Sequence, residues 1–326
     1  MKIAIIKLGA LGDVVRTLAI LPALKEKYPN SEIDWITKKP VNELLENHPD
    51  IKNILVLPTD PKEEYDILYN FDIDKEATDL AMKIKANKKL GFYEQNGYPA
   101  AFNIGSEYYL NTMFDDDLKK ANKKTYQEMM FQAAELEYKK QMPAIYLTEK
   151  DKDYANKFVQ SNNIDIDKLI GIHLGASSRW PSKAWGEERI KEFIVKAKKK
   201  GYEILLFGGQ SEIAKQASII PEMEKSGIKV YQNNPYNSLS EFASLVNICK
   251  YIVCSDSLAI HIAVALKKPT IGLFFCTSPD EVESYGIMKK IVSLMLYNFF
   301  PEKMNVYNEE LVNSITADQV LSEIEK

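Results

Sequence analysis

The sequence is poor in cysteine and in long apolar runs, and it carries little net charge. Three cysteines among 326 residues are too few for a disulfide framework and lack the paired spacing of a zinc site, which indicates a reducing compartment. No stretch approaches the roughly 18 apolar residues of a membrane span, and the first residues lack the pattern of a signal peptide. The chain has 42 Lys plus Arg and 46 Asp plus Glu, which gives a net charge of −4. Because this charge is slightly negative, no nucleic-acid partner is expected. We therefore expect a cytoplasmic protein whose only membrane contact is peripheral, on the inner face of the cytoplasmic membrane.

An alternation of strands and helices runs along most of the chain. The length and a hydrophobic content of 45% predict two domains, each with its own core. A β-branched run at Lys2–Lys7, a glycine-containing turn and an apolar helical pattern predict strand, loop and helix. The alternation restarts at an apolar strand, Leu169–Leu174, after a polar stretch. We expect an α/β fold of two Rossmann-like domains with parallel sheets, 1–163 and 164–326.

Two segments outside this alternation carry separate expectations. Residues 316–325 form a short amphipathic pattern, predicted to be a last helix that packs back on the first domain. Asp115–Tyr138 is predicted to be helical, with lysines near its start at positions 119, 120, 123 and 124. These lysines either face an anionic membrane surface or form a solvated helix face.

Candidate site residues follow strands, because open parallel sheets bind ligands at the carboxyl ends of their strands. Two such sheets facing each other would place these edges around a shared cleft. The first loop contains Gly9, Gly12 and Asp13 and opens a helix that also carries Arg16. Asp13 is either a helix cap or a general base that takes a proton from an acceptor hydroxyl. The spacing is not G-x-G-x-x-G, which gives little support to a nicotinamide-dependent oxidoreductase.

The loop over 175–185 holds the densest polar cluster, which includes Ser177, Ser178, Arg179 and Lys183. Residues 168–200 contain nine Lys or Arg and three Glu, whereas the whole chain has a net charge of −4. We expect this loop to attract an anionic phosphate through Lys183, with Arg179 as a second candidate cation and hydroxyls as donors. The lysines at 196–200 are instead expected to be a solvated helix end.

Two further loops follow strands in the second half. Gly208-Gly209 gives backbone N–H groups room to approach a ligand, and Glu212 either binds ribose hydroxyls or caps the next helix. Asp256 and Ser257 open a helix whose N-terminus suits an anion or a sugar hydroxyl. His261 lies one turn later, and a lone helical histidine is more often a packed residue than a catalyst.

Together and in this order, the four loops resemble those of glycosyltransferase family 9, the heptosyltransferases of lipopolysaccharide core synthesis and their relatives. The resemblance covers most of the chain. It rests on four segments: IIKLGALGDVVRTLAILPAL, IGIHLGASSRWPSKAWGEERIKEFI, LLFGGQSE and CSDSLAIHIAVALKKPTIGLFFCTSPDEVESYG.

This resemblance implies a GT-B architecture, with the acceptor in the first domain, the nucleotide-sugar donor in the second, and inversion at the anomeric carbon. Asp13 then matches the catalytic base, and Gly9, Gly12 and Arg16 belong to the acceptor-side loop. Lys183 matches the cation on the donor phosphates, and Glu212 the acid near the ribose. The remaining expected donor-binding residues are Ser177, Ser178, Gly208, Gly209, Asp256, Ser257, His261 and Thr277.

Two departures from the family pattern bear on the donor. Leu258 stands where relatives usually have glycine, and Phe275-Cys276-Thr277 stands where Gly-Pro-Thr is common. Both changes are expected to line the donor pocket, which leaves open a nucleotide or sugar other than ADP-heptose. Loss of transfer, leaving a nucleotide-sugar binding protein, is the alternative.

A metal role is not expected. Asp72-Ile-Asp74 and Asp165-Ile-Asp167 match the letters of an Asp-x-Asp metal motif, but one lies beside a helix start and the other in the linker. We expect no metal and no cofactor, with the nucleotide sugar as substrate and a glycan or lipid-linked saccharide as acceptor.

Overall fold

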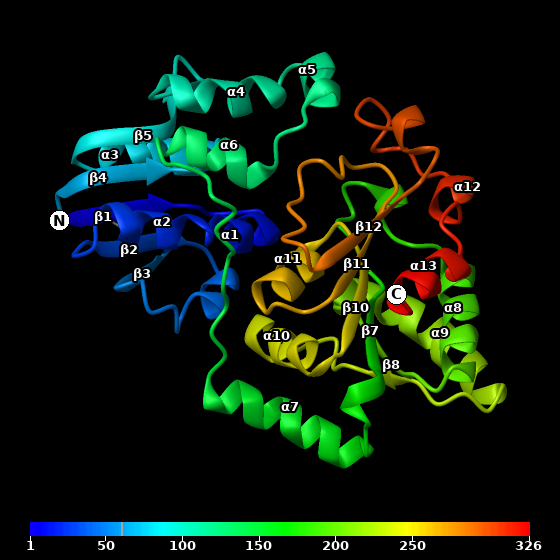
Figure 1. Cartoon of the computed structure of the whole chain (residues 1–326). Helices are drawn as coiled ribbons and strands as arrows, with labels where there is room; N and C mark the ends of the chain where they lie inside the picture. The colour runs from blue at the N-terminus through cyan, green and yellow to red at the C-terminus, as the bar shows by residue number, and fades with distance from the viewer. Residues whose placement is uncertain (60) are drawn as a thin grey trace. The chain divides into compact units, whose positions relative to one another are not determined.

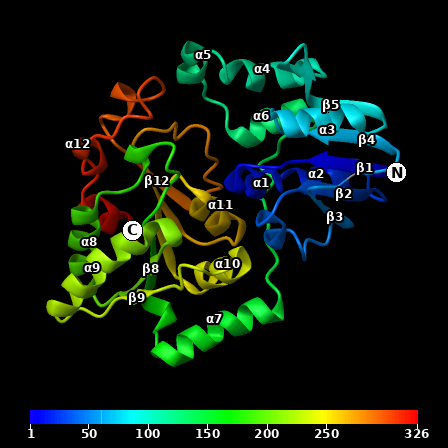
Figure 2. The ribbon, with the colours of Figure 1, turned by 180° about the vertical axis from the view of Figure 1, so that it is seen from behind.

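The computed structural model describes residues 1–59 and 61–326 and divides them into two compact units. One unit holds residues 1–146 with 280–283, and the other holds 147–279 with 284–326. Each contains one six-stranded sheet, drawn in Figure 1 and seen from behind in Figure 2. The expected α/β class with two Rossmann-like domains is confirmed.

The first unit is built on the strand order β3-β2-β1-β4-β5-β6. All neighbours are parallel except β5 and β6, which form an antiparallel hairpin. The strands are β1 (Lys2–Ile6), β2 (Glu32–Thr37), β3 (Asn53–Val56), β4 (Tyr65–Asn70), β5 (Ala86–Gln95) and β6 (Tyr98–Ala101). The central strand β1 is buried from Ile3 to Ile6, as its β-branched run requires for a strand with neighbours on both sides.

Short helices cover this sheet. They are α1 (Leu11–Thr17), α2 (Ile20–Lys27), η1 (Val41–Leu44), α3 (Lys75–Lys83), α4 (Ile104–Thr112), α5 (Asp116–Ala121) and α6 (Tyr126–Ala133). Helix α3 packs on β4 and β5, whereas α6 packs against α1, α2 and α4.

The single helix expected over Asp115–Tyr138 is wrong, because α5 and α6 are separate. Asn122 adopts an extended conformation at the end of α5, and Thr125 starts α6 with a capping box. In that box the Thr125 hydroxyl accepts from the Glu128 N–H, and the Glu128 carboxylate accepts from the Thr125 N–H. Two of the lysines proposed for membrane contact have partners here: Lys123 pairs with Asp280, and Lys124 lies 3.9 Å from the Tyr108 ring centroid.

The second unit has the strand order β12-β11-β10-β7-β8-β9, and all its neighbours are parallel. Its strands are β7 (Leu169–His173), β8 (Glu203–Phe207), β9 (Tyr231–Gln232), β10 (Tyr251–Ser255), β11 (Thr270–Phe274) and β12 (Met288–Val292). Its longer helices are α7 (Glu149–Asn162), α8 (Glu187–Lys199), α9 (Ile213–Lys225), α10 (Leu239–Ile248), α11 (Leu258–Ala265) and α13 (Ala317–Ile324). The short ones are η2 (Ile166–Lys168), η3 (Pro181–Lys183), η4 (Gln210–Glu212), η5 (Leu296–Asn298) and α12 (Glu309–Val312). In both views α8, α9 and α13 lie on one face of the sheet, and α10 and α11 lie on the other.

The ends of the second unit differ from the expectation. The units divide at Tyr146 and Leu147 instead of after residue 163, because α7 packs against α10 and the Tyr154 hydroxyl accepts a 2.6 Å hydrogen bond from Asn237. The last helix, α13, belongs to the second unit. It packs on α8, and Val320, Leu321 and Ile324 join the core of the second unit.

Asp280–Glu283 is a short stretch of chain that belongs to the first unit although both of its flanks belong to the second. The carbonyl of Glu281 accepts a hydrogen bond from the N–H of Tyr126, at the first turn of α6 (3.0 Å). The first sheet domain is thus completed by residues that come late in the chain.

His48 provides a pH-dependent contribution to the stability of the first unit. Burial lowers the pKa of His48 to about 4, and its Nδ1 accepts a hydrogen bond from the N–H of Asp50 (3.3 Å), which a protonated ring could not do. The group is therefore neutral when folded and binds a proton more readily when unfolded. Stability is fully present above the unfolded pKa of about 6.5 and falls as the pH drops toward 4.

When the pH is lowered from 7 to 5, we expect the unfolding free energy of the wild-type protein to fall by about 2 kcal/mol more than that of His48→Gln. Denaturant unfolding of both proteins at the two pH values measures this difference in slope. The comparison does not depend on whether the variant is less stable overall. Equal pH slopes in the two proteins would contradict a buried, neutral His48.

Within the described residues, no helix is both long enough and apolar enough to cross a bilayer.

Candidate functional site

In the first unit, the loop after β1 brings the carboxylate of Asp13 between two cations. Asp13 lies in the first turn of α1, whose cap residue is Ala10, so it is not the N-cap. Its Oδ1 lies 2.9 Å from Arg16 Nη2, and its Oδ2 lies 4.0 Å from Lys7 Nζ. The Asp13 side chain is 26% exposed, whereas that of Lys7 is 3% exposed. A partly accessible carboxylate with fixed partners is suited to accept a proton from a bound hydroxyl.

A second carboxylate, that of Asp72, holds this loop through hydrogen bonds to its backbone. Its Oδ2 accepts hydrogen bonds from the N–H groups of Leu8 (3.0 Å) and Gly9 (3.1 Å) and lies 3.5 Å from Lys7 Nζ. Sequence reasoning considered Asp72 only as part of a metal motif and missed Lys7. The position of Lys7 at the end of a buried strand could have indicated its role, because a buried ammonium requires a carboxylate or another polar partner.

Tyr126 from α6 forms one wall of this site. The Arg16 guanidinium lies 3.7 Å from the centroid of the ring, and the Tyr126 hydroxyl is 3.0 Å from Thr17 Oγ1. Burial alone would lower the pKa of Arg16, but Asp13 and Tyr126 oppose it and the net shift is upward. The pKa of Lys7 is likewise raised, since Tyr126, Asp72 and Asp13 outweigh the effect of burial. Both side chains are therefore cations beside Asp13.

In the second unit, three neighbouring strands bring separate loops to one edge. Strands β11, β10 and β7 are adjacent, so the residues that follow them meet at the carboxyl edge of the sheet. Lys183 Nζ lies 2.9 Å from Asp256 Oδ2, and both side chains are mostly buried. His261 Nε2 lies 4.0 Å from Asp256 Oδ1. Three side chains from two of the candidate loops, Lys183, Asp256 and His261, therefore lie together at this edge.

Two hydroxyls at this edge are buried. The Oγ of Ser257, after β10, and the Oγ1 of Thr277, after β11, have no hydrogen-bond partner among residues 1–59 and 61–326. An unsatisfied buried hydroxyl costs about 1–3 kcal/mol. Phosphate oxygens accept hydrogen bonds from such groups, so a bound phosphate would remove this cost.

The residues before Lys183 in the same loop are more open. Ser177, Ser178 and Arg179 are exposed, and Ser177 Oγ accepts from the Arg179 N–H at 3.4 Å. Lys183 Nζ lies 5.0 Å from the centroid of a Trp180 ring, which leaves the lysine between an indole and a carboxylate. The serines are therefore accessible, while Lys183 is held in place.

The positive stretch over 168–200 does not act as one surface. Six of its cations form ion pairs within the unit, with partners outside the loop: Lys168, Arg189, Lys191, Lys196, Lys198 and Lys200. Lys183 is the cation that is paired at the carboxyl edge of the sheet.

Glu212 lies against two glycines at the ends of different strands. A Cβ on Gly175 would lie 2.4 Å from Glu212 Oε1, and one on Gly208 would lie 2.6 Å from Glu212 Cβ. Glu212 Oε2 accepts a 2.8 Å hydrogen bond from the Gly209 N–H. The glycines therefore allow the carboxylate to lie directly beside the loop after β7.

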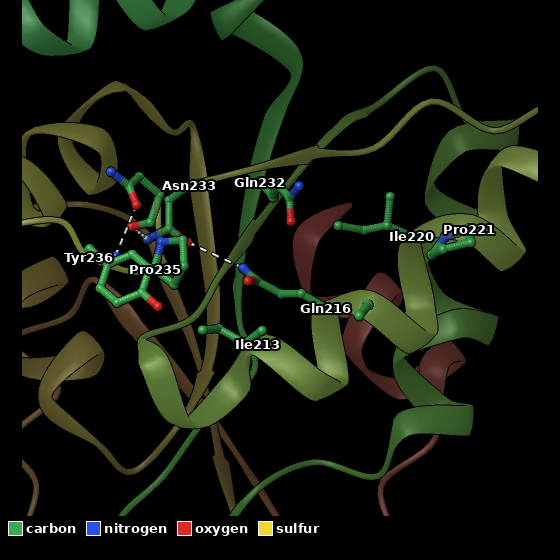
Figure 3. A pocket seen from close by; sticks show the side chains of 10 residues that line it. Ile213, Gln216, Ile220, Pro221, Gln232, Asn233, Pro235 and Tyr236 are labelled. Atoms are coloured by element: carbon green, nitrogen blue, oxygen red, sulfur yellow. Dashed lines mark hydrogen bonds between the residues drawn. The ribbon is translucent and has the colours of Figure 1, made fainter.

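A groove of about 680 Å³ adjoins this turn. Figure 3 shows α9 on one side and the segment after β9 on the other, with a hydrogen bond from Gln216 to Asn233 at its base (3.4 Å). Its apolar lining comes mainly from Ile213, Ala217, Ile220, Pro221, Pro235 and Tyr236. Sequence reasoning missed this groove, because its two walls are distant in the chain.

The departure at Phe275-Cys276-Thr277 is buried. Phe275 and Cys276 are fully buried members of the hydrophobic core of the second unit. Burial raises the pKa of the Cys276 thiol to about 11, so it is a neutral thiol. Leu258 begins α11 and is partly buried.

The described residues contain no group of three or more His, Cys, Asp or Glu side chains placed to hold a metal ion. Asp72, the first residue of one Asp-x-Asp match, is instead engaged with Lys7 and the β1–α1 loop.

Known proteins are similar to this chain over most of its length. The model of glycosyltransferase family 9 (heptosyltransferase) matches residues 61–310. Lipooligosaccharide heptosyltransferase 2 of Haemophilus ducreyi is 24% identical, over 99% of this chain and 98% of that protein.

Two solved structures share the fold. A family 9 glycosyl transferase from Veillonella parvula has a TM-score of 0.79 at 20% identity, covering 99% of this chain and 96% of that one. The E. coli heptosyltransferase WaaC with ADP has a TM-score of 0.67 at 17% identity, covering 100% and 99%. The architecture is the expected GT-B fold, and the alternative of a nicotinamide-dependent oxidoreductase is set aside. With most of its length matched by the family model, the chain belongs to glycosyltransferase family 9, the heptosyltransferases, and is a glycosyltransferase.

Proposed function

We propose that the protein is an inverting, metal-independent transferase that moves a heptose or hexose from a nucleotide diphosphate sugar to a saccharide acceptor. The observation that carries this proposal is the buried Lys183–Asp256 pair together with two hydroxyls, Ser257 Oγ and Thr277 Oγ1, that find no hydrogen-bond partner in the described part of the chain. A diphosphate would receive positive charge from Lys183 and hydrogen bonds from both hydroxyls. No metal is needed in this scheme, since Lys183 supplies the charge that a divalent ion would otherwise supply.

Asp13 is the proposed base. Its carboxylate takes the proton of the acceptor hydroxyl as that oxygen forms a bond to the anomeric carbon of the sugar. The bond from this carbon to the diphosphate oxygen breaks, and the nucleotide diphosphate leaves with the electron pair. Arg16 and Lys7 hold the carboxylate in one orientation, and Gly9 and Gly12 lie in the loop that would approach the acceptor.

We assign the ribose to Glu212 and the nucleobase to the groove beside it. Glu212 precedes Ile213, the first residue of α9 and one of the residues lining the groove, and the apolar surfaces of Pro235 and Tyr236 suit a flat ring. The backbone at Gly208 and Gly209 leaves room for close approach. Ser177, Ser178 and His261 complete the proposed donor site.

ADP-heptose is the donor we propose, and the core of lipopolysaccharide, or another lipid-linked glycan, is the acceptor. The support is that the relatives are lipopolysaccharide or lipooligosaccharide heptosyltransferases and that the WaaC structure holds ADP. A lipid-linked acceptor would place the enzyme at the inner face of the cytoplasmic membrane. Exposed apolar side chains at Ile104 and Phe114 are consistent with such peripheral contact.

A thermal-shift screen of nucleoside diphosphates tests the donor assignment. We expect ADP to raise the melting temperature more than GDP, UDP or CDP. At 100 times its Kd, a ligand should stabilise the fold by about 2.7 kcal/mol. A response to none of the four would refute the donor site. Binding without transfer to any glycan acceptor would instead support the nucleotide-sugar binding protein.

A further inference from the structure

We propose that Lys215 is a positioning residue that fastens the two ends of the loop carrying Lys183 and so holds this loop in its donor-binding form. This inference rests on the proposed function of that loop. It concerns a side chain in α9 that belongs to none of the four candidate loops.

The geometry is a bridge between two carbonyls. Lys215 Nζ donates to the carbonyl of Leu174 (3.2 Å), directly after β7, and to the carbonyl of Trp185 (2.8 Å), which precedes Gly186, the N-cap of α8. Leu174 and Trp185 are buried in the core, and the Trp185 indole N–H donates to the Ile315 carbonyl (3.0 Å). The segment between these two anchors contains Ser177, Ser178 and Lys183. One ammonium therefore sets the separation of the two ends of the donor loop.

Among residues 1–59 and 61–326, Lys215 forms no ion pair within 4.0 Å, and its ammonium donates to two carbonyls. Glu187 of α8 and Glu212 of η4 act on it from a greater distance. His173 of β7 also faces this region, and its ring donates from Nδ1 to the Gly175 carbonyl (3.0 Å). A cation bonded only to carbonyls loses much of its hydration without gaining a counter-ion. Such an arrangement favours an anion arriving nearby.

This position has a measurable consequence. Burial lowers the pKa of Lys215 to about 8, so part of the population carries a neutral amine at pH 8. A diphosphate bound in the loop adds negative charge close to Lys215 and raises its pKa. Binding should then be accompanied by net proton uptake at pH 8. A lysine with a purely structural role, remote from the ligand, would show no such uptake.

The test is calorimetric titration of the full-length protein with ADP at pH 8, in two buffers that differ in ionisation enthalpy. We expect Lys215→Met to weaken ADP binding by about tenfold or more and to abolish proton uptake. Lys215→Arg keeps a cation and its donors but does not titrate, so it should bind ADP within a fewfold of wild type without proton uptake. This second variant keeps the test valid if the methionine variant fails to fold.

Lys268→Met is the matched control. Lys268 is also a partly buried lysine with a lowered pKa, and it donates to the carbonyl of Asn247 (2.8 Å), but it precedes β11, at the opposite end of the strands. It should retain both affinity and uptake. Wild-type affinity in Lys215→Met, or unchanged uptake in Lys215→Arg, would overturn the role of Lys215. Failure of the wild-type protein to bind any nucleoside diphosphate would overturn the proposed function itself, and the loop inference with it.

Discussion

Asp13→Asn is expected to lower the rate of sugar transfer by about 100-fold or more while leaving the affinity for ADP nearly unchanged. An amide keeps the size of the side chain but cannot take the proton of the acceptor hydroxyl, and general-base catalysis contributes about 10²–10⁴ to a rate. Asp13 also lies in the unit that lacks the donor loops, so donor affinity should not depend on it. Transfer from ADP-heptose, followed by release of ADP, measures the first quantity, and calorimetry measures the second.

The control for this variant is Asp79→Asn. Asp79 is a carboxylate of the same unit that forms a surface ion pair with Lys75 (2.9 Å), away from the β1–α1 loop. It should transfer at the wild-type rate, because surface pairs contribute little. Asp13→Asn that retained full transfer would eliminate Asp13 as the base. A loss of ADP affinity equal to the loss of rate would show that the substitution had disturbed the protein more widely.

Lys183→Met is expected to weaken ADP binding by about 100-fold, through loss of the charge-assisted bond to the diphosphate. The substitution also leaves Asp256 mostly buried without its 2.9 Å partner, which by itself would disturb the site. The double variant Lys183→Met with Asp256→Asn separates these causes. If the cation is what binds the diphosphate, the double variant regains stability but not affinity.

Lys198→Met gives the comparison from the same positive stretch. Its ammonium pairs with Glu203 (3.0 Å) at the far end of α8, so ADP affinity should not change. Recovery of wild-type affinity in the double variant would mean that Lys183 acts only by neutralising Asp256, and the diphosphate assignment would fail.

The central strands could be predicted from the sequence because their signals are local. Glu32–Thr37, Glu203–Phe207 and Thr270–Phe274 are short segments rich in Ile, Leu, Phe and Trp, and each is a strand with those bounds. The β5–β6 hairpin was missed although Asn96-Gly97 is a strong turn signal. Both residues have positive φ, which the type of turn joining two such strands requires.

The pairs that build the site could not be predicted, because they depend on strand order. Lys183 meets Asp256 since β10 lies beside β7, and nothing in the alternation of elements specifies that neighbour. Asp72 reaches Leu8 and Gly9 for the same reason, because β4 pairs with β1. The residue types were visible in the sequence, while their partners were set by the topology of the sheets.

The four residues Asp280–Glu283 determine where the chain can be cut without damage to the first unit. A protein truncated after Tyr146 would contain every strand of the first sheet but would lack the Glu281 carbonyl that receives the Tyr126 N–H. Tyr126 in turn supports Arg16, the partner of Asp13. Residues 1–146 alone therefore do not make up the complete proposed acceptor domain. Chimaeras between members of the family should transfer residues 280–283 together with the N-terminal half.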